Sequence, residues 1–332
     1  MNSELVQGLT PVQVVALVGV LGVGAQWVAW RFRLPAIVLM LGIGLVVGPV
    51  LGWFLPERDL GPIYRPLISV AVAIILFEGG LTLTGHRLGD ARLPVKRLVY
   101  LGAPLGWCLS ALVLWLEVGL SWQSAAVFGG VMVVTGPTVI APMLRQAKLR
   151  ARPAQILQWE AILNDPVGVL IAVLLLEVVL VLETELSAGG AAWVVGSGIG
   201  FAAIAGWAAG AGMALAFRRA WVPEYMKVPV LFAVVLAVFA VTDTILHETG
   251  LLAVTIMGMV LANANLSSYA ELHRFKEQAT ILLVSGVFVV MAASLDFSTL
   301  GQLTWRAALF VVLTVALVRP LQALLPLIGT GL

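Results

Sequence analysis

Long apolar runs separated by short polar connections recur along the whole chain, and they restrict its fold more than any other feature. A helix needs about 20 apolar residues to cross a bilayer, or roughly 30 with its connection. Because lipid offers no partners for backbone polar groups, such a segment must be helical. The runs therefore predict an all-α polytopic membrane protein with about eleven transmembrane helices. They are Val12–Trp30, Pro35–Leu55, Pro66–Leu83, Leu98–Leu116, Trp122–Leu144, Ile156–Leu182, Ala191–Phe217, Val228–Leu246, Leu251–Ala262, Ala279–Leu295 and Trp305–Leu325.

The composition excludes several other classes of protein. Of the 332 residues, 61% are hydrophobic and 11% are charged, whereas soluble domains are about 45–50% apolar and about 25% charged. An ordinary soluble enzyme and a disordered chain are thus excluded. The net charge of +2 is too small for a surface that neutralises phosphates, so nucleic acid is not an expected partner. The single cysteine, Cys108, excludes an intrachain disulfide and a cysteine metal cluster.

The basic residues are sorted to one side of the predicted spans. Of the 19 Lys and Arg residues, 15 follow odd-numbered spans and Arg319 lies at the end of the last one, while the exceptions are Arg58, Arg65 and Arg306. Cytoplasmic loops are enriched in Lys and Arg. We therefore expect a multi-pass protein of the cell membrane with its N-terminus outside and its C-terminus in the cytoplasm. No polar connection is long enough for a soluble domain, so residues 1–332 are expected to form one transmembrane domain.

Five acidic residues lie inside the predicted spans: Glu78, Glu160, Asp165, Glu177 and Asp243. An ionisable residue at this depth is costly and marks a candidate functional site. Glu177 and Asp243 lie near span ends, where a side chain can reach the interface. Glu78 could line a cavity or pair with a buried base, and the sequence does not choose between these.

The sixth span carries the densest polar cluster. Glu160 and Asn164 are four residues apart and share a helix face, with Asp165 on the adjoining face. Pro166 removes a backbone donor and so frees a carbonyl oxygen. Oxygen ligands of this kind suit a hard cation or a proton. The alternative is a buried hydrogen-bond network that only locks helices together.

The fifth span is unusual because two prolines and a glycine interrupt its apolar run, Thr135-Gly136-Pro137-Thr138-Val139-Ile140-Ala141-Pro142. Irregular backbone survives in a membrane only where protein buries it or where it lines a cavity. Secondary transporters build midplane ion sites from such discontinuous helices. The span is therefore predicted to be a broken helix, with a simple proline kink as the alternative.

Three motifs together carry a family resemblance: Phe77-Glu78-Gly79-Gly80-Leu81, Thr135-Gly136-Pro137-Thr138 and Glu160-x-x-x-Asn164-Asp165-Pro166. They resemble the membrane domain of the monovalent cation:proton antiporter family 1, in particular its NhaP-type Na⁺(K⁺)/H⁺ exchangers. The resemblance implies an NhaA-like inverted-repeat fold, a homodimer and an elevator-like movement. It implies no cofactor beyond the transported Na⁺ or K⁺ and H⁺.

The resemblance also implies roles for individual residues. Asp165 would carry cation and proton alternately, while Asn164 and Thr135 would help to hold the monovalent cation. Glu160 would stabilise the site, partly through an arginine on a later helix. The further supporting positions are Glu78, Thr138, Gly136 and Pro137.

Two departures from the family pattern change these expectations. Gly136 stands where many members have an aspartate, so one ligand is lost. The chain ends at Leu332, shortly after Val318-Arg319-Pro320, whereas family members continue with further helices. We therefore expect an incomplete fold in which the arginine partner of Glu160 is absent, and a transport-inactive fragment is one alternative.

Two other functional classes compete with antiport. A channel, such as a gated K⁺ efflux system, would need a continuous polar pore or a carbonyl filter, and no TVGYG-like segment is present. An intramembrane protease would need paired aspartates or a His-Glu-x-x-His motif, and it is disfavoured because the only histidines, His86, His247 and His273, lie in or beside loops. With Asn164 where a second aspartate could stand, exchange of one proton for one cation, and hence electroneutral transport, is expected. The sequence does not distinguish Na⁺ from K⁺ or Li⁺.

Overall fold

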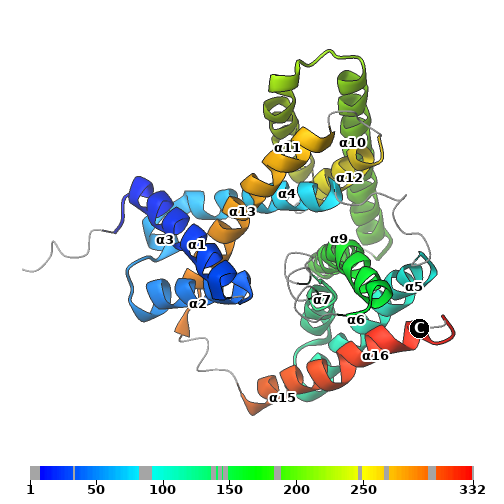
Figure 1. The fold of residues 1–332 in the computed structure, drawn as a ribbon. Coiled ribbons are helices and arrows are strands. Elements are labelled where there is room, and N and C mark those ends of the chain that lie inside the picture. Colours follow the sequence, from blue (N-terminus) through cyan, green and yellow to red (C-terminus); the bar gives the residue numbers. More distant parts are fainter. Residues whose placement is uncertain are drawn as a thin grey trace, which may run out of the picture. The chain divides into compact units, whose positions relative to one another are not determined.

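A computed structural model describes residues 8–32, 34–81, 92–135, 140, 144, 149–182, 188–245, 249–264, 269–297 and 304–330. These residues form helices joined by short turns, and no strand occurs among them (Figure 1). The chain divides into two compact units. Residues 1–75 and 267–302 make up unit 1, and residues 76–266 and 303–332 make up unit 2.

Unit 1 is built on close contacts between helices. Gly22 on α1 lies against Ser285 on α13, where an added Cβ would be 2.7 Å from the Ser285 Cβ. Gly44 on α2 lies against Ala292 on α13 in the same way, at 2.6 Å. Such contacts let helix backbones approach closely inside a membrane. The helices are α1 (Pro11–Phe32), α2 (Ala36–Leu45) with η1 (Val46–Val50), α3 (Pro56–Asp59), η2 (Gly61–Ile63), α4 (Tyr64–Leu81) as far as Ile75, and α13 (Tyr269–Ala293).

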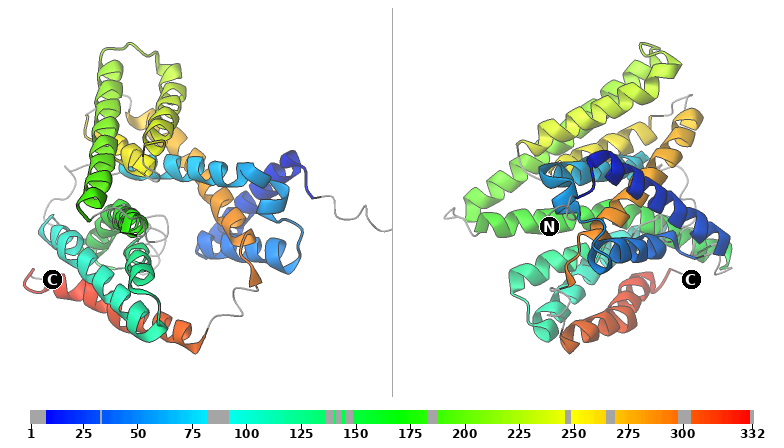
Figure 2. Two further views of the ribbon diagram at one scale, coloured as in Figure 1. Left: turned by 180° about the vertical axis from the view of Figure 1, so that it is seen from behind. Right: turned by 90° about the vertical axis from the view of Figure 1, so that its left-hand side faces the viewer.

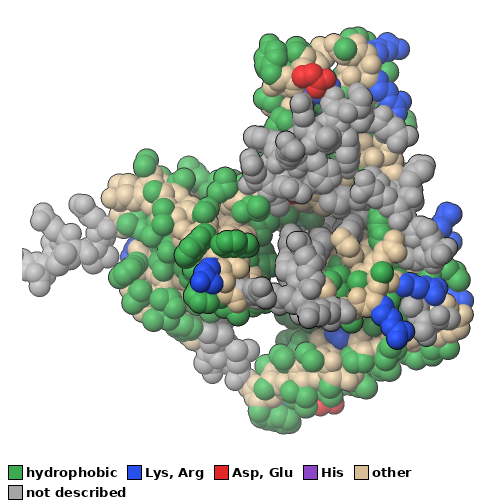
Figure 3. All heavy atoms as spheres, in the orientation of Figure 1, with side chains coloured by type: hydrophobic (Ala, Val, Ile, Leu, Met, Phe, Trp, Pro, Cys, Tyr) green, Lys and Arg blue, Asp and Glu red, His purple; other side chains and the backbone are tan. Residues whose placement is uncertain are grey.

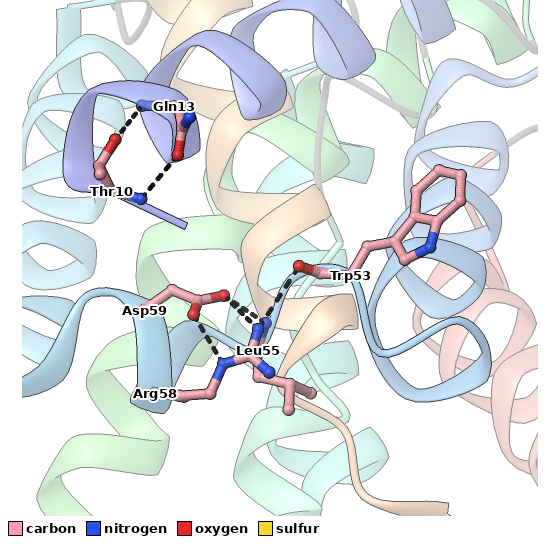
Figure 4. A network of polar contacts seen from close by, with 6 residues as sticks. All are labelled: Thr10, Gln13, Trp53, Leu55, Arg58 and Asp59. Atoms are coloured by element: carbon pink, nitrogen blue, oxygen red, sulfur yellow. Dashed lines mark hydrogen bonds and ion pairs between the residues drawn. The ribbon is translucent and has the colours of Figure 1, made fainter. Parts of the chain in front are cut away.

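An ion pair with a buried carboxylate fixes the turn between η1 and α4 in unit 1 (Figure 4). Arg58 Nε lies 2.7 Å from Asp59 Oδ1, and the Asp59 side chain is fully buried. The backbone N–H of Leu55 donates to Asp59 Oδ2 over 2.9 Å. Arg58 Nη2 also donates to the Trp53 carbonyl. Both oxygens of the Asp59 carboxylate thus accept hydrogen bonds from nearby residues, as a buried charged group requires.

Unit 2 holds the remaining helices, which Figure 2 shows from two further directions. The end of α4, from Leu76 onward, packs on α12, because Gly258 on α12 faces the Phe77 carbonyl. Gly206 on α10 likewise faces Ala253 on α12. The helices are α5 (Arg92–Arg97), η5 (Leu98–Gly102), α6 (Ala103–Val113), η6 (Leu114–Val118), α7 (Trp122–Val131), α9 (Ala151–Leu182), α10 (Ala188–Arg218), η7 (Glu224–Met226), α11 (Lys227–Asp243), α12 (Thr249–Ala262), α15 (Trp305–Leu313), η8 (Thr314–Val318), α16 (Arg319–Leu324) and η9 (Leu325–Leu327).

The all-helical membrane fold predicted from the sequence is confirmed. Among the described residues, six helices are long and apolar enough to cross a membrane: Pro11–Phe32, Gly61–Leu81, Arg92–Val118, Gly196–Arg218, Glu224–Asp243 and Trp305–Leu327. Large apolar side chains such as Val12, Trp193 and Trp305 are more than 70% exposed, and apolar side chains cover much of the face seen in Figure 3. This is the pattern of helices whose outer faces meet lipid.

Two helices begin well before the predicted spans. α13 begins at Tyr269, although the apolar run begins at Ala279, and α5 begins at Arg92, although its run begins at Leu98. The added turns are rich in Ala, Leu, Glu, Lys and Arg, which favour helix without being apolar. The helices thus extend beyond the apolar runs, and the apolar part of α13, Ile281–Ala293, begins close to the predicted start of its span.

Candidate functional site

The candidate site lies where the end of α7 meets the middle of α9. Gly130 on α7 faces Ala172 on α9, and an added Cβ would be 3.0 Å from the Ala172 Cα. Beyond the end of α7, Val134 covers Gly168, where an added Cβ would lie 2.8 Å from the Val134 nitrogen. These contacts place Thr135, the next residue, beside the part of α9 that contains Gly168.

Helix α7 begins at a capped end and stops within the apolar run. The Ser121 hydroxyl accepts a hydrogen bond from the Ser124 N–H, as a helix N-cap does. The helix ends at Val131, and Met132–Thr135 continue in non-helical conformation. The Thr135 hydroxyl is buried and has no hydrogen-bond partner among the described residues. An unpaired polar atom of this kind is costly and points to a ligand.

Helix α9 presents the second unpaired oxygen. Asn164 is 1% exposed, and its amide nitrogen donates to Glu160 Oε1 over 2.7 Å. This bond confirms that the two residues share one face of the helix, as their spacing predicted. The Asn164 carbonyl oxygen is buried without a partner in the described part of the chain. α9 continues through Pro166 to Leu182, so the proline does not end the helix.

Arg319 joins the end of α7 to the C-terminal helices. Its Nη2 donates to the Met132 carbonyl over 2.7 Å and to the Val134 carbonyl over 3.4 Å. These carbonyls lie past the end of a helix, where they have no helical partner and where a positive charge is favourable. Arg319 also attracts the Glu160 carboxylate electrostatically.

This arrangement corrects one expectation from the sequence. The arginine partner of Glu160 was expected beyond Leu332, but Arg319, within the chain, already interacts electrostatically with Glu160. The charge pattern counts Arg319 with the cytoplasmic residues, at the end of the last span, Trp305–Leu325. The signal that could have identified it is an arginine inside Val318-Arg319-Pro320, with apolar residues on both sides.

Other predicted residues are placed less completely. Glu78 is half-buried near the end of α4, two residues before Gly80, which packs against the α12 backbone at Gly258. Asp165 lies on α9 directly after Asn164, but its side chain falls outside the described part of the structure. Gly136, Pro137 and Thr138 also lie outside the described residues.

The chemistry available at this site is therefore that of oxygen ligands. A hydroxyl from Thr135 and an amide oxygen from Asn164 are buried and unpaired, on segments held together at Val134 and Gly168. Neutral oxygens like these, beside an adjacent aspartate, are ligands for a hard cation. Glu160 lies on α9, one of these two segments, and Arg319 on α16 donates a hydrogen bond to the other segment at the Met132 carbonyl.

Comparison with known proteins agrees with the family resemblance. The family model described as "Sodium/hydrogen exchanger, transmembrane" matches residues 14–331. The K⁺/H⁺ antiporter NhaP of Alkalimonas amylolytica is 28% identical over 95% of this chain and 54% of its own length. The Na⁺/H⁺ antiporter 1 of Methanocaldococcus jannaschii is 25% identical over 94% of this chain and 74% of its own length.

The fold has a solved counterpart. The sodium proton antiporter MjNhaP1 from Methanocaldococcus jannaschii superposes with a TM-score of 0.82 over 97% of this chain and 79% of that one, at 22% identity. At this identity the similarity shows the shared fold. The chain spans about half the length of the Alkalimonas relative and about three quarters of the Methanocaldococcus relative.

Proposed function

The chain belongs to the sodium/hydrogen exchanger family, and we propose that it exchanges a monovalent cation, Na⁺ or K⁺, for a proton across the cell membrane. The relatives named above are antiporters for Na⁺ or K⁺ and H⁺, and the family is one of transporters rather than enzymes. The proposal extends this activity to the present chain.

One observation carries the proposal. Two buried oxygens that have no partner in the described structure, Thr135 Oγ1 and Asn164 Oδ1, belong to the segments that contact each other at Val134 and Gly168. Leaving a buried acceptor unpaired costs roughly 1–3 kcal/mol, and a bound cation would offset that cost. A cation there would also neutralise Asp165, the residue after Asn164.

The mechanism follows from competition for one carboxylate. In the proposal Asp165 binds either the cation or a proton, and Thr135 and Asn164 ligate only the cation. The cation binds on one side of the membrane and is released on the other, and the proton is carried in the opposite direction. The result is exchange of one ion for the other. Because Asn164 carries no charge, one proton replaces one monovalent cation and the exchange is electroneutral.

Glu160 and Arg319 support this site rather than ligate the ion. Glu160 orients Asn164 by accepting its amide hydrogen, and Arg319 balances the Glu160 charge. We further propose that Glu78, Gly136, Pro137 and Thr138 complete the cavity. Thr138 and its neighbours would extend the non-helical end of α7 into the broken helix expected from their prolines and glycine.

The finer architecture belongs to the same proposal. We propose about eleven spans within one transmembrane domain, with an inverted-repeat arrangement, the N-terminus outside and the C-terminus in the cytoplasm. We propose that the chain acts as a homodimer in the bilayer. The family match over residues 14–331 supports a single domain, and the sorting of basic residues supports the orientation.

The test is cation-induced dequenching of a pH-sensitive dye in everted vesicles. Wild type should dequench the dye on addition of Na⁺ or K⁺, and Asp165→Asn should abolish the response at equal protein level. Undiminished exchange in Asp165→Asn would remove the assigned role of this residue. A signal that reports passive conductance without coupling to protons would favour a channel, and no signal in wild type would favour a transport-inactive fragment.

A further inference from the structure

A buried glutamine stands behind Arg319. Gln322 on α16 is 5% exposed, although a glutamine inside a membrane protein must bury two donors and an acceptor. Its amide lies directly over Gly106 on α6, where an added Cβ would be 2.5 Å from Oε1 and 2.9 Å from Nε2. Only a residue without a side chain leaves room for this amide.

The glutamine is hydrogen-bonded to the arginine of the candidate site. Arg319 Nη1 donates to Gln322 Oε1 over 3.4 Å, while Nη2 of the same guanidinium donates to the Met132 carbonyl over 2.7 Å. A planar guanidinium that is held at two nitrogens has a fixed orientation. Gln322 therefore holds the Arg319 guanidinium at Nη1, while Nη2 of the same group reaches the end of α7.

Helix α6 contacts both α16, which carries Gln322, and α7, whose end Arg319 reaches. On one side, Gly102 and Gly106 face α16 at Gln322. On the other side, Trp107 Nε1 donates to the Ala126 carbonyl of α7 over 3.0 Å. A shift of Gln322 on Gly106 must therefore move Arg319 relative to α7, because α7 is fixed to α6 independently.

We propose that Gln322 is a positioning residue for cation binding. Seated on Gly106, it orients Arg319, and Arg319 in turn fixes the carbonyls of Met132 and Val134 immediately before Thr135. Gln322 touches neither ion. The inference rests on the proposed function, because it assigns the effect of Gln322 to the affinity for the transported cation.

The first test isolates the acceptor. Gln322→Met keeps a side chain of similar length over Gly106 but removes Oε1. The KM for the cation should rise about threefold to tenfold in everted vesicles, as expected for one lost hydrogen bond, while the maximal rate stays within about twofold of wild type. A KM equal to that of wild type would overturn the inference.

The second test uses the fit between Gly106 and Gln322. Gly106→Ala should displace the amide and raise the KM by a similar factor, whereas Gly212→Ala, where an added Cβ meets nothing within 4 Å, should leave it unchanged. In the Gln322→Ala background, Gly106→Ala should not raise the KM any further, because the glutamine amide that the added methyl group would displace is absent. If Gly106→Ala has its full effect in that background, it acts on helix packing alone and the positioning role is wrong.

A measurement without transport separates the two proposals. If wild type shows no exchange, the proposed function fails, and the positioning role is then decided by melting temperatures in detergent. Arg319→Met and Gln322→Met should each lower the melting temperature, and the double variant should lower it by less than the sum of the two shifts, because both remove one interaction. Additive shifts would overturn the positioning role whatever the transport result.

Discussion

Asn164 donates its amide hydrogen to Glu160 Oε1 over 2.7 Å, and this bond fixes which end of the amide is available to a ligand. The nitrogen donates to Glu160, and the carbonyl oxygen remains buried and unpaired in the described structure. Glu160 thereby holds the amide in one orientation and leaves its oxygen available as the acceptor that a cation site requires.

Asn164→Ala should weaken cation binding. The variant removes one neutral ligand and also frees Glu160, so the KM for Na⁺ or K⁺ should rise about tenfold or more. The measurement is dye dequenching in everted vesicles over a range of cation concentrations. Asn263→Ala is the matched control, because exposed Asn263 also donates to a residue four positions earlier, the Met259 carbonyl. Equal KM values for the two variants would remove Asn164 from the site.

Gly168→Ala should disturb the contact that brings Thr135 to α9. The added Cβ would lie 2.7 Å from Val134 Cγ2 and 2.8 Å from the Val134 nitrogen, so the end of α7 must move. We expect a loss of about 1–3 kcal/mol of stability, together with loss of exchange. Gly200→Ala, where nothing lies within 4 Å, should be neutral or slightly stabilising. A Gly168→Ala protein with unchanged melting temperature and exchange would contradict this close contact.

Arg319→Lys should show that geometry, and not charge alone, matters at the end of α7. Lysine keeps the positive charge near Glu160 but cannot reach Gln322 and Met132 from one planar group. Exchange should fall at least severalfold, and the melting temperature should fall by about 2–4 °C for each kcal/mol lost. Arg306→Lys, at an exposed arginine, should change neither quantity. Full activity of Arg319→Lys would reduce the role of Arg319 to that of a charge.

The sequence predicted the local features of this site better than its long-range partners. The face shared by Glu160 and Asn164 follows from helix periodicity, and the start of α7 at Trp122 follows from the end of a polar turn. Both depend only on residues close in sequence. The same reasoning predicted the all-helical membrane fold.

The contacts of Arg319 could not be predicted in that way. Met132 is 187 residues away along the chain, and no local pattern indicates which helix an arginine at the end of an apolar run will face. The fit of Gln322 over Gly106 also depends on how two distant helices pack. Hydropathy identifies both helices, but only their packing brings these residues together.

Acid should weaken the ion pair that fixes the turn before α4 in unit 1. Burial raises the pKa of Asp59, but the hydrogen bonds from Arg58 and from the Leu55 and Leu9 N–H groups, together with the Arg58 charge, lower it more. The net pKa therefore lies below the ordinary value of 3.8. A carboxyl group whose pKa is lower in the folded state stabilises the fold above its ordinary pKa, and that contribution is lost as the pH falls below it.

Asp59→Asn should therefore destabilise the protein in a pH-dependent way. At pH 7 the variant should melt several degrees below wild type, because asparagine cannot pair with Arg58 and leaves a buried polar group poorly satisfied. The difference should narrow as the pH falls below 3.8, where the wild-type carboxyl also begins to lose its charge. Melting curves in detergent between pH 3 and pH 7 provide the measurement.

Glu57→Gln, at an exposed carboxylate two residues away, should give no difference in melting temperature from wild type at either end of this range. A difference between Asp59→Asn and wild type that stays constant with pH would show that the fold does not depend on the Asp59 charge.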